Sequence, residues 1–195
     1  PKTGENDANS NHEQFYEQVT SPKRIDSLKS AVNEFIDNVA KKSPDSSIAI
    51  VKFAGNKKDV SGNDFYNERG YRFNHSQIVK NLTKVDGNDI TLKNAINSLS
   101  PAGATAADYG MQHAQTIVNN AANDGRKKVV IMFTDGEPNH QNGFDKNVAN
   151  SAISASKSIK DAGATVYTIG IFSGANGTPT DVSKLGNTDT NKYMH

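Results

Sequence analysis

A single aspartate follows the apolar run Val129–Phe133, whose five consecutive apolar side chains are typical of a strand buried on both faces in a parallel sheet. The run stops at Thr134-Asp135-Gly136, so Asp135 is expected at the carboxyl end of that strand. Ligands of α/β sheets bind at this end. A carboxylate there suits a hard cation such as Mg²⁺, whereas the alternative is an aspartate that accepts hydrogen bonds from a turn.

A second oxygen ligand is offered by Thr105, which lies in a loop of small residues that leads into a predicted helix ending near Asn123. A threonine hydroxyl and an aspartate oxygen fit a Mg²⁺ site that keeps its waters and leaves one position open for the carboxylate of a ligand. The alternative for Thr105 is capping of the helix that follows it. Glu137 either supports the metal ligands or is a solvated loop charge.

Alternating strands and helices must position these two residues. The pattern predicts helices at 21–39, 89–99 and 145–162, besides the helix after Thr105, and strands at 47–54, 77–85, 127–133 and 165–172. Ser21-Pro22 is a good helix start, and Gly163 is expected to end the helix at 145–162. This order indicates an α/β, Rossmann-like fold with a mostly parallel sheet, helices on both faces and one antiparallel edge strand, formed by 77–85 against 47–54.

Residues Gly55–Asn74 are polar and carry four interspersed aromatic residues. They predict a protruding, mobile loop outside the core, because their polar groups could not be buried without losing hydrogen-bond partners. The aromatic side chains either pin this loop to the domain or contact a ligand.

Composition narrows the function classes. The chain has 195 residues, enough for one domain with a real core, and we expect a flexible lead-in or insertion at 1–20 before the domain at 21–195. A formal net charge of +1 gives no field that would attract nucleic acid, and no apolar run is long enough for membrane insertion. Without cysteine there is neither a disulfide framework nor a zinc-thiolate site. The five histidines stand without neighbouring ligands at helical or turn spacing, and His140 is expected to face solvent.

Two segments together resemble the von Willebrand factor type A domain: G-A-T-A-A-D-Y-G-M at 103–111 and V-V-I-M-F-T-D-G-E-P at 129–138. The resemblance covers about residues 21–175. It implies a metal-ion-dependent adhesion site for Mg²⁺ (or Mn²⁺ or Ca²⁺), with Thr105 as a ligand and Asp135 as a ligand either directly or through water. Gly103 and Gly136 would let the two loops approach closely. The Asn- and Lys-rich loops are similar to those of tip adhesins from Gram-positive pili.

This sequence departs from the family pattern at one important point. The family's first strand ends in D-x-S-x-S, and neither that motif nor an apolar strand precedes Ser21. The family's final strand and helix are also not evident, so we expect a domain truncated at both ends. A metal would then lack about half of its protein ligands, and we expect it to bind weakly or not at all.

The resemblance implies an extracellular adhesion module on a bacterial cell surface, in the cell wall or a pilus, with a role in virulence. Its partners would be a host matrix or cell-surface protein and other pilus subunits, with no nucleic acid and no enzymatic activity. Two alternatives remain open. One is a structural pilus domain with a vestigial metal site, and the other is a Mg²⁺-dependent phosphoryl-transfer enzyme that uses Asp135 in the D-G-E sequence.

Overall fold

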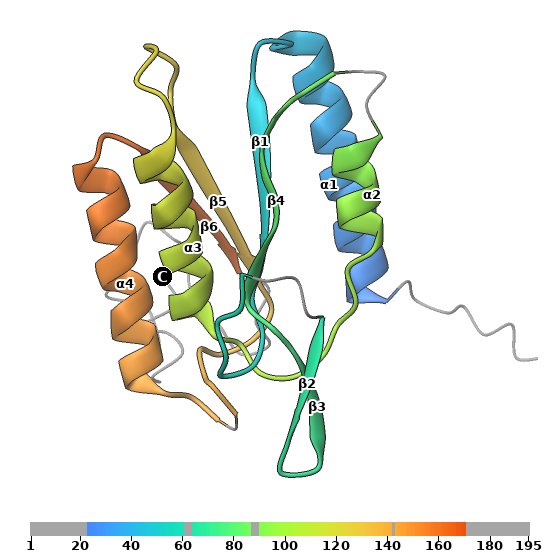
Figure 1. Cartoon of the computed structure of the whole chain (residues 1–195), viewed down its shortest axis with the longest axis vertical. Coiled ribbons are helices and arrows are strands. Elements are labelled where there is room, and N and C mark those ends of the chain that lie inside the picture. The colour runs from blue at the N-terminus through green and yellow to red at the C-terminus, as the bar shows by residue number, and fades with distance from the viewer. Residues whose placement is uncertain (1–22, 61–63, 87–89, 142, 171–195) are drawn as a thin grey trace, which may run out of the picture.

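The computed structural model describes residues 23–60, 64–86, 90–141 and 143–170. The α/β class predicted from the sequence is confirmed, because strands lie between a pair of helices on one side, α1 and α2, and a second pair on the other side, α3 and α4 (Figure 1). The helices are α1 (Arg24–Lys42), α2 (Thr91–Asn97), α3 (Ala107–Asn120) and α4 (Lys146–Asp161). The strands are β1 (Ser47–Lys52), β2 (Phe65–Glu68), β3 (Tyr71–Asn74), β4 (Gln77–Lys84), β5 (Val129–Thr134) and β6 (Thr165–Gly170).

The described strands form three pairs. β1 and β4 are antiparallel, which confirms the pairing expected for 47–54 and 77–85. β5 and β6 are parallel and are connected through α4, as a βαβ unit requires. The third pair is the antiparallel hairpin β2–β3. Within the described residues, β1 and β5 are not hydrogen-bonded to each other, so the β1–β4 and β5–β6 pairs are separate sheets.

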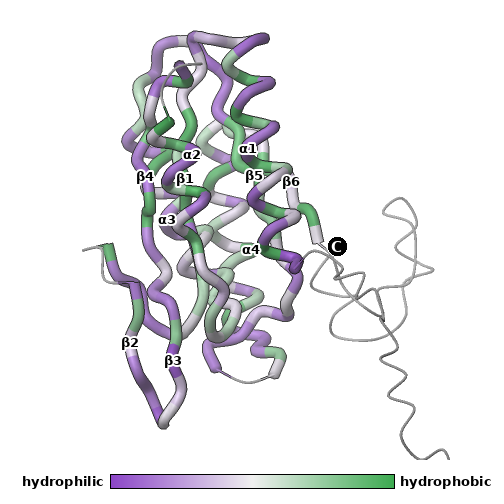
Figure 2. Tube along the Cα trace, turned by 90° about the vertical axis from the view of Figure 1, so that its right-hand side faces the viewer, coloured by the Kyte–Doolittle hydropathy of each residue, from purple (hydrophilic) through white to green (hydrophobic). Residues whose placement is uncertain are grey.

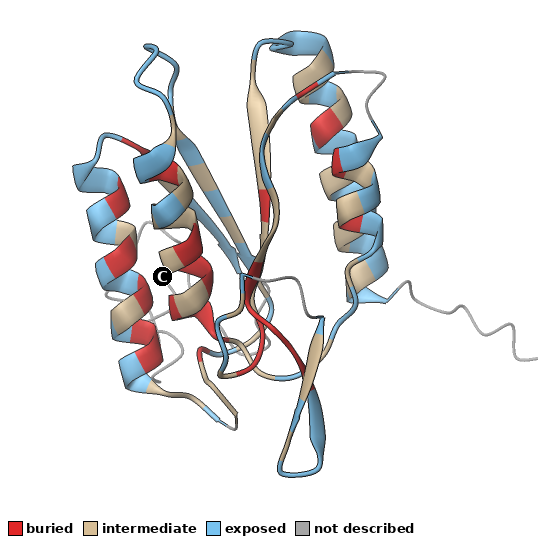
Figure 3. Ribbon diagram, in the orientation of Figure 1, coloured by how far each residue is buried: buried red, intermediate tan, exposed pale blue. Residues whose placement is uncertain are grey.

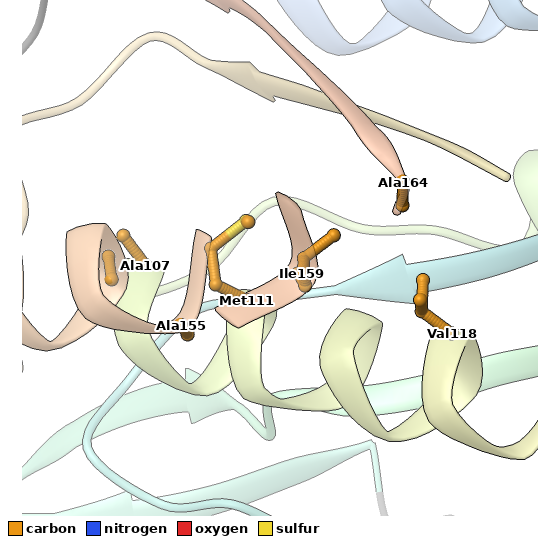
Figure 4. Close-up of a cluster of buried hydrophobic side chains, with 7 residues drawn as sticks. Ala107, Met111, Val118, Ala155, Ile159 and Ala164 are labelled. Atoms are coloured by element: carbon orange, nitrogen blue, oxygen red, sulfur yellow. The ribbon is translucent and has the colours of Figure 1, made fainter. Parts of the chain in front are cut away.

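Two apolar clusters form the core, and buried residues line the inner sides of the helices (Figure 3). The first joins α3 to α4 and includes Met111, Val118 and Ile159 (Figure 4). Val130, Met132 and Val166 of the β5–β6 pair pack against it. The second joins α1 and α2 to the β1–β4 pair through Ile36, Ile50, Val85, Leu92 and Ile96.

The expectation that 129–133 and 166–171 are buried on both faces is wrong for the residues described. Ile131 is 37% exposed and Tyr167 is 57% exposed, and Val129, Phe133 and Ile169 share their exposed face. Side chains alternate along a strand, and α3 and α4 cover only the face that carries Val130, Met132 and Val166. Ile171 lies outside the described residues.

Residues 55–74 include a hairpin instead of an irregular loop, because β2 and β3 pair over four residues each. The hairpin projects from the layers as expected, and its tip is hydrophilic (Figures 1 and 2). It is nevertheless not wholly outside the core, since Phe73 and Asn74 are buried. Phe73 packs against Gly103, where a Cβ atom would lie only 2.2 Å from the ring. The hairpin thereby supports the loop that carries Thr105.

The helix boundaries agree closely with the predictions for the described residues. Ser21 and Pro22, the expected start of the first helix, lie outside the described residues. Val148, Ala152 and Ile159 form the buried face of α4, whereas Ile153 is exposed. The side chain of Asp145 caps α4 by accepting a hydrogen bond from the Asn147 amide at 2.8 Å. Gly163 has φ +85 after the last turn, as a helix-ending glycine does.

Candidate metal-binding rim

Thr105 lies immediately before α3 but does not cap it. The N-cap position is Ala106, and no side chain makes a capping hydrogen bond there. The backbone of Thr105 instead pairs with the loop that follows β5: its amide donates to the Asn139 carbonyl at 3.2 Å, and the Asn139 amide donates to the Thr105 carbonyl at 2.9 Å. This short bridge holds the threonine loop against the aspartate loop.

Gly136 marks the closest approach of these two loops. A Cβ atom at this position would lie 2.6 Å from Oγ1 of Thr105, so only glycine allows the threonine hydroxyl to sit so close to the residue after Asp135. The structure therefore brings Thr105 and the Asp135 loop together at the carboxyl end of β5, where the sequence predicted them. The turn itself is closed by Thr134, whose hydroxyl donates to the Gly136 carbonyl at 3.1 Å.

The side chain of Asp135 points to solvent and contacts a remote residue. Its side chain is 56% exposed, and its Oδ2 atom accepts a hydrogen bond from Nη1 of Arg24 at 3.2 Å. Arg24 is the first residue of α1 and is also largely exposed. We call the group formed by Thr105, Asp135 and Arg24 the rim. It combines one hydroxyl, one carboxylate and one guanidinium cation that already neutralises the carboxylate.

The donor types at the rim suit a hard divalent ion, but they are few. No group of three or more His, Cys, Asp or Glu side chains is arranged to hold a metal in the described part of the chain. Thr105 and Asp135 would therefore supply two oxygen ligands and leave most positions of an octahedral ion to water. Mg²⁺ tolerates such a shell because it gives up its waters reluctantly.

A contact between Asp108 and His140 lies beside the rim and was not predicted. Asp108 is buried in the first turn of α3, and both of its carboxylate oxygens contact Nε2 of His140, at 3.0 and 3.1 Å. The Tyr109 ring stacks on the imidazole with centroids 4.9 Å apart. Burial raises the pKa of the Tyr109 hydroxyl, and the Asp108 carboxylate raises it further.

The expectation that His140 merely faces solvent is therefore wrong. His140 follows Asp135 by only a few residues, and Asp108 follows Thr105 as closely, but nothing in either local pattern shows that the two side chains meet. Their contact ties the first turn of α3 to the aspartate loop. The pair consequently helps to keep Thr105 and Asp135 in their relative positions.

Comparison with known proteins identifies a matching domain family and a protein of similar fold. The family model of the von Willebrand factor type A domain matches residues 18–195. No curated protein matches the chain significantly. In fold it is similar to the crystal structure of the pilus adhesin SpaC from Lactobacillus rhamnosus GG in its open conformation, with a TM-score of 0.54, 17% sequence identity and 77% of this chain covered. The match spans only 22% of the SpaC chain, so the similarity concerns one part of that adhesin.

Proposed function

Because this chain belongs to the von Willebrand factor type A domain family, we propose that it is a binding module that attaches a bacterial surface structure, such as a pilus, to a protein partner. The partner is a matrix or cell-surface protein of a host, or another pilus subunit. No covalent bond is made or broken. None of the described helices has both the length and the apolar character that crossing a bilayer requires.

The observation that supports this proposal is the approach of Thr105 to the Asp135 loop across Gly136. The Thr105 hydroxyl and the Asp135 carboxylate would hold Mg²⁺, or Mn²⁺ or Ca²⁺ in its place. The bound ion would supply positive charge that attracts a carboxylate of the partner. With two protein ligands, we expect a dissociation constant that is roughly millimolar, the range in which weak extracellular cation sites work.

Titration of Mg²⁺ into the 195-residue chain by isothermal titration calorimetry tests the site. We expect weak binding that is lost in Asp135→Asn and in Thr105→Val but is retained in Thr105→Ser, which keeps the hydroxyl. Circular dichroism of each variant controls for folding. Equal Mg²⁺ affinity in Asp135→Asn and the unmodified chain would contradict the proposal.

Adhesion is tested on the same proteins with immobilised matrix proteins as probes. Retention should depend on Mg²⁺, should be reversed by EDTA, and should be absent for Asp135→Asn. Release of phosphate from a phosphate ester by the purified chain would instead favour the enzyme hypothesis and would contradict a pure binding function.

A second candidate function is favoured by the Arg24–Asp135 ion pair. Because this pair neutralises the carboxylate without a metal, the domain could act as a structural element whose metal site is vestigial. That alternative predicts no measurable Mg²⁺ binding by the unmodified chain.

A further inference from the structure

A cleft of about 540 Å³ lies at the end of the β5–β6 pair that is opposite to the rim. Arg126, Lys127 and Lys128, which precede β5, line one side of it, and Gly163 and Thr165 line it where β6 begins. Figure 1 shows the loop between α3 and β5 at the same end of the molecule as the turn that joins α1 to β1. The cleft is as large as the sites that hold small molecules in proteins, and the proposed metal site uses none of its residues.

Lys128 brings a fixed positive charge to this cleft. It is half-buried, and its Nζ atom donates to the carbonyls of Val118 at 3.2 Å and Ala121 at 3.1 Å, and to Oδ1 of Asn123 at 3.1 Å. All three acceptors are uncharged, so they hold the ammonium group in place without a carboxylate. The two carbonyls belong to the end of α3, where the helix dipole favours a cation.

Two contacts fix the orientation of Arg126. Its Nε and Nη2 atoms donate to Oδ2 of Asp124, and its Nη1 atom donates to the Asp45 carbonyl at 2.7 Å. A guanidinium has five N–H donors, so two remain available after these three bonds. Asp124 balances the charge of Arg126, and the excess positive charge of the cleft therefore comes from Lys127 and Lys128.

The surface around the cleft adds to this charge. Lys127 is exposed, and its side chain makes neither a hydrogen bond nor an ion pair with the described residues. Lys84 approaches the cleft's surroundings through Asp45, whose Oδ1 atom lies 3.6 Å from its Nζ atom. Residues 41–46, 84–86 and 123–128 together carry six cations and three carboxylates. This excess is larger than the formal net charge of +1 for the whole chain, so positive charge is concentrated at this end.

The kinds of residue in the cleft favour a hydrophilic polyanion as its ligand. Among the described residues that line it, none is aromatic, none is a large apolar residue and none is acidic. A specific interface with a protein has an apolar core, and a site for single-stranded nucleic acid has aromatic side chains on which bases stack. A cluster of Lys and Arg without either feature is typical of a surface that binds heparin-like chains.

We propose that this end of the domain binds a sulfated polysaccharide of the matrix, with one sulfate group held in the cleft by Lys127 and the two remaining donors of Arg126. Further sulfate groups along the same polysaccharide would meet Lys84 and the ammonium groups of Lys41 and Lys42 at the end of α1. The inference adds a second partner to the proposed adhesive function and does not depend on the metal. Because the cleft and the rim lie at opposite ends of β5, both can be occupied at once.

The test follows the ¹⁵N-labelled chain by NMR while a heparin hexasaccharide is added. We expect the amide signals of Gly125, Lys127 and Thr165 to shift, whereas the fully desulfated hexasaccharide should leave them unchanged. Lys127→Gln removes one charge from a side chain that holds no other residue in place, so the fold should be retained and the affinity should fall about fivefold. Lys23→Gln removes the same charge from an exposed position next to Arg24, near the rim, and should leave the affinity unchanged.

Raising the NaCl concentration from about 0.1 M to about 1 M shortens the screening length about threefold and should abolish the response to the heparin hexasaccharide. A response that survives this change would contradict an interaction carried by charge. The inference would also be overturned by an absent response, an equal response to the desulfated hexasaccharide, or an undiminished affinity in Lys127→Gln.

Two further probes separate the proposed ligand from other polyanions and from the metal site. Equal affinity for a DNA duplex or for a hexaglutamate peptide would show that the surface does not select sulfated polysaccharide, and would overturn the inference. Asp135→Asn should abolish Mg²⁺ binding at the rim while leaving the response to the heparin hexasaccharide intact. Failure of the metal proposal and failure of this inference are therefore distinguishable in the same set of proteins.

Discussion

At the scale of single residues, the Arg24 guanidinium and a divalent metal ion would compete for the Asp135 carboxylate. Arg24 is 67% exposed and Asp135 is 56% exposed, so water screens their attraction and the ion pair contributes little to stability. A divalent ion that binds Asp135 must nevertheless displace or share this guanidinium. Arg24 therefore sets how strongly the rim can hold a metal.

Replacing Arg24 should accordingly strengthen metal binding. Exposed ion pairs contribute up to about 1 kcal/mol, so we expect Arg24→Gln to raise the Mg²⁺ affinity by up to about fivefold in calorimetric titrations. Lys157→Gln is the matched control, because it removes the same charge from an exposed pair with Asp161 on α4. If both variants bind Mg²⁺ equally, Arg24 does not compete at the rim.

His113 makes stability depend on pH. It is 1% exposed, and its Nε2 donates to the Ser76 carbonyl at 2.9 Å. Burial lowers the pKa of His113, and the nearby Lys58 cation lowers it further, although the bond to Ser76 acts in the opposite direction. The unfolded chain therefore takes up this proton at a higher pH than the folded chain does.

We expect the free energy of unfolding to fall as the pH drops from about 6.5, the ordinary histidine value, to the lowered pKa of the folded state. His113→Gln keeps a donor toward Ser76 but cannot titrate, so the loss between pH 7.5 and pH 5 should be smaller in this variant. Urea unfolding at the two pH values measures the difference. Parallel losses in both proteins would show that other groups control the acid response.

At the scale of secondary-structure elements, the β2–β3 hairpin contacts both loops of the rim. Phe73 packs against Gly103 and so supports the threonine loop, and Glu68 near the hairpin's tip contacts the aspartate loop through Gln141. A two-stranded hairpin is marginally stable by itself, so these contacts must hold it against the domain.

Truncation of Phe73 should release the hairpin. Phe73→Ala removes a buried ring and is expected to lower the free energy of unfolding by about 3 kcal/mol. Tyr71→Ala is the control, since Tyr71 lies on the same strand but is exposed. Similar denaturation midpoints for the two variants would contradict this role of Phe73.

At the scale of the whole molecule, the β5–β6 pair leaves an apolar face exposed in the described part of the chain. Five large apolar or aromatic side chains share it, from Val129, Ile131, Phe133, Tyr167 and Ile169. Among the described strands, β5 is hydrogen-bonded to β6 alone. A contiguous exposed apolar face of this kind favours association.

We therefore expect the chain to self-associate as its concentration rises. The double substitution Ile131→Ser and Phe133→Ser should reduce the mean mass measured by sedimentation equilibrium, with little change in stability because both side chains are partly exposed. Ile153→Ser is the control, since Ile153 is exposed on α4, away from this face. A chain that stays monomeric throughout the concentration series would show that the face is not adhesive.

Local patterns in the amino-acid sequence predicted the types and order of the elements apart from the β2–β3 hairpin, because apolar periodicity and helix-ending signals are local properties of the chain. The sequence also predicted that the loops carrying Thr105 and Asp135 meet, since loops at the carboxyl ends of strands gather at one rim. The α/β class followed from the alternation of strands and helices along the chain.

Which faces are covered and which side chains meet depends on how elements remote in sequence pack together. Local patterns predicted β5 and β6 as buried, but burial depends on what packs against each face, and α3 and α4 cover only one. Arg24 meets Asp135 across 111 positions of sequence, Glu68 meets Gln141 across 73, and Asp108 meets His140 across 32. Ion pairs and hydrogen bonds depend on distance in space, which the packing of remote elements sets, so no local signal could identify these partners.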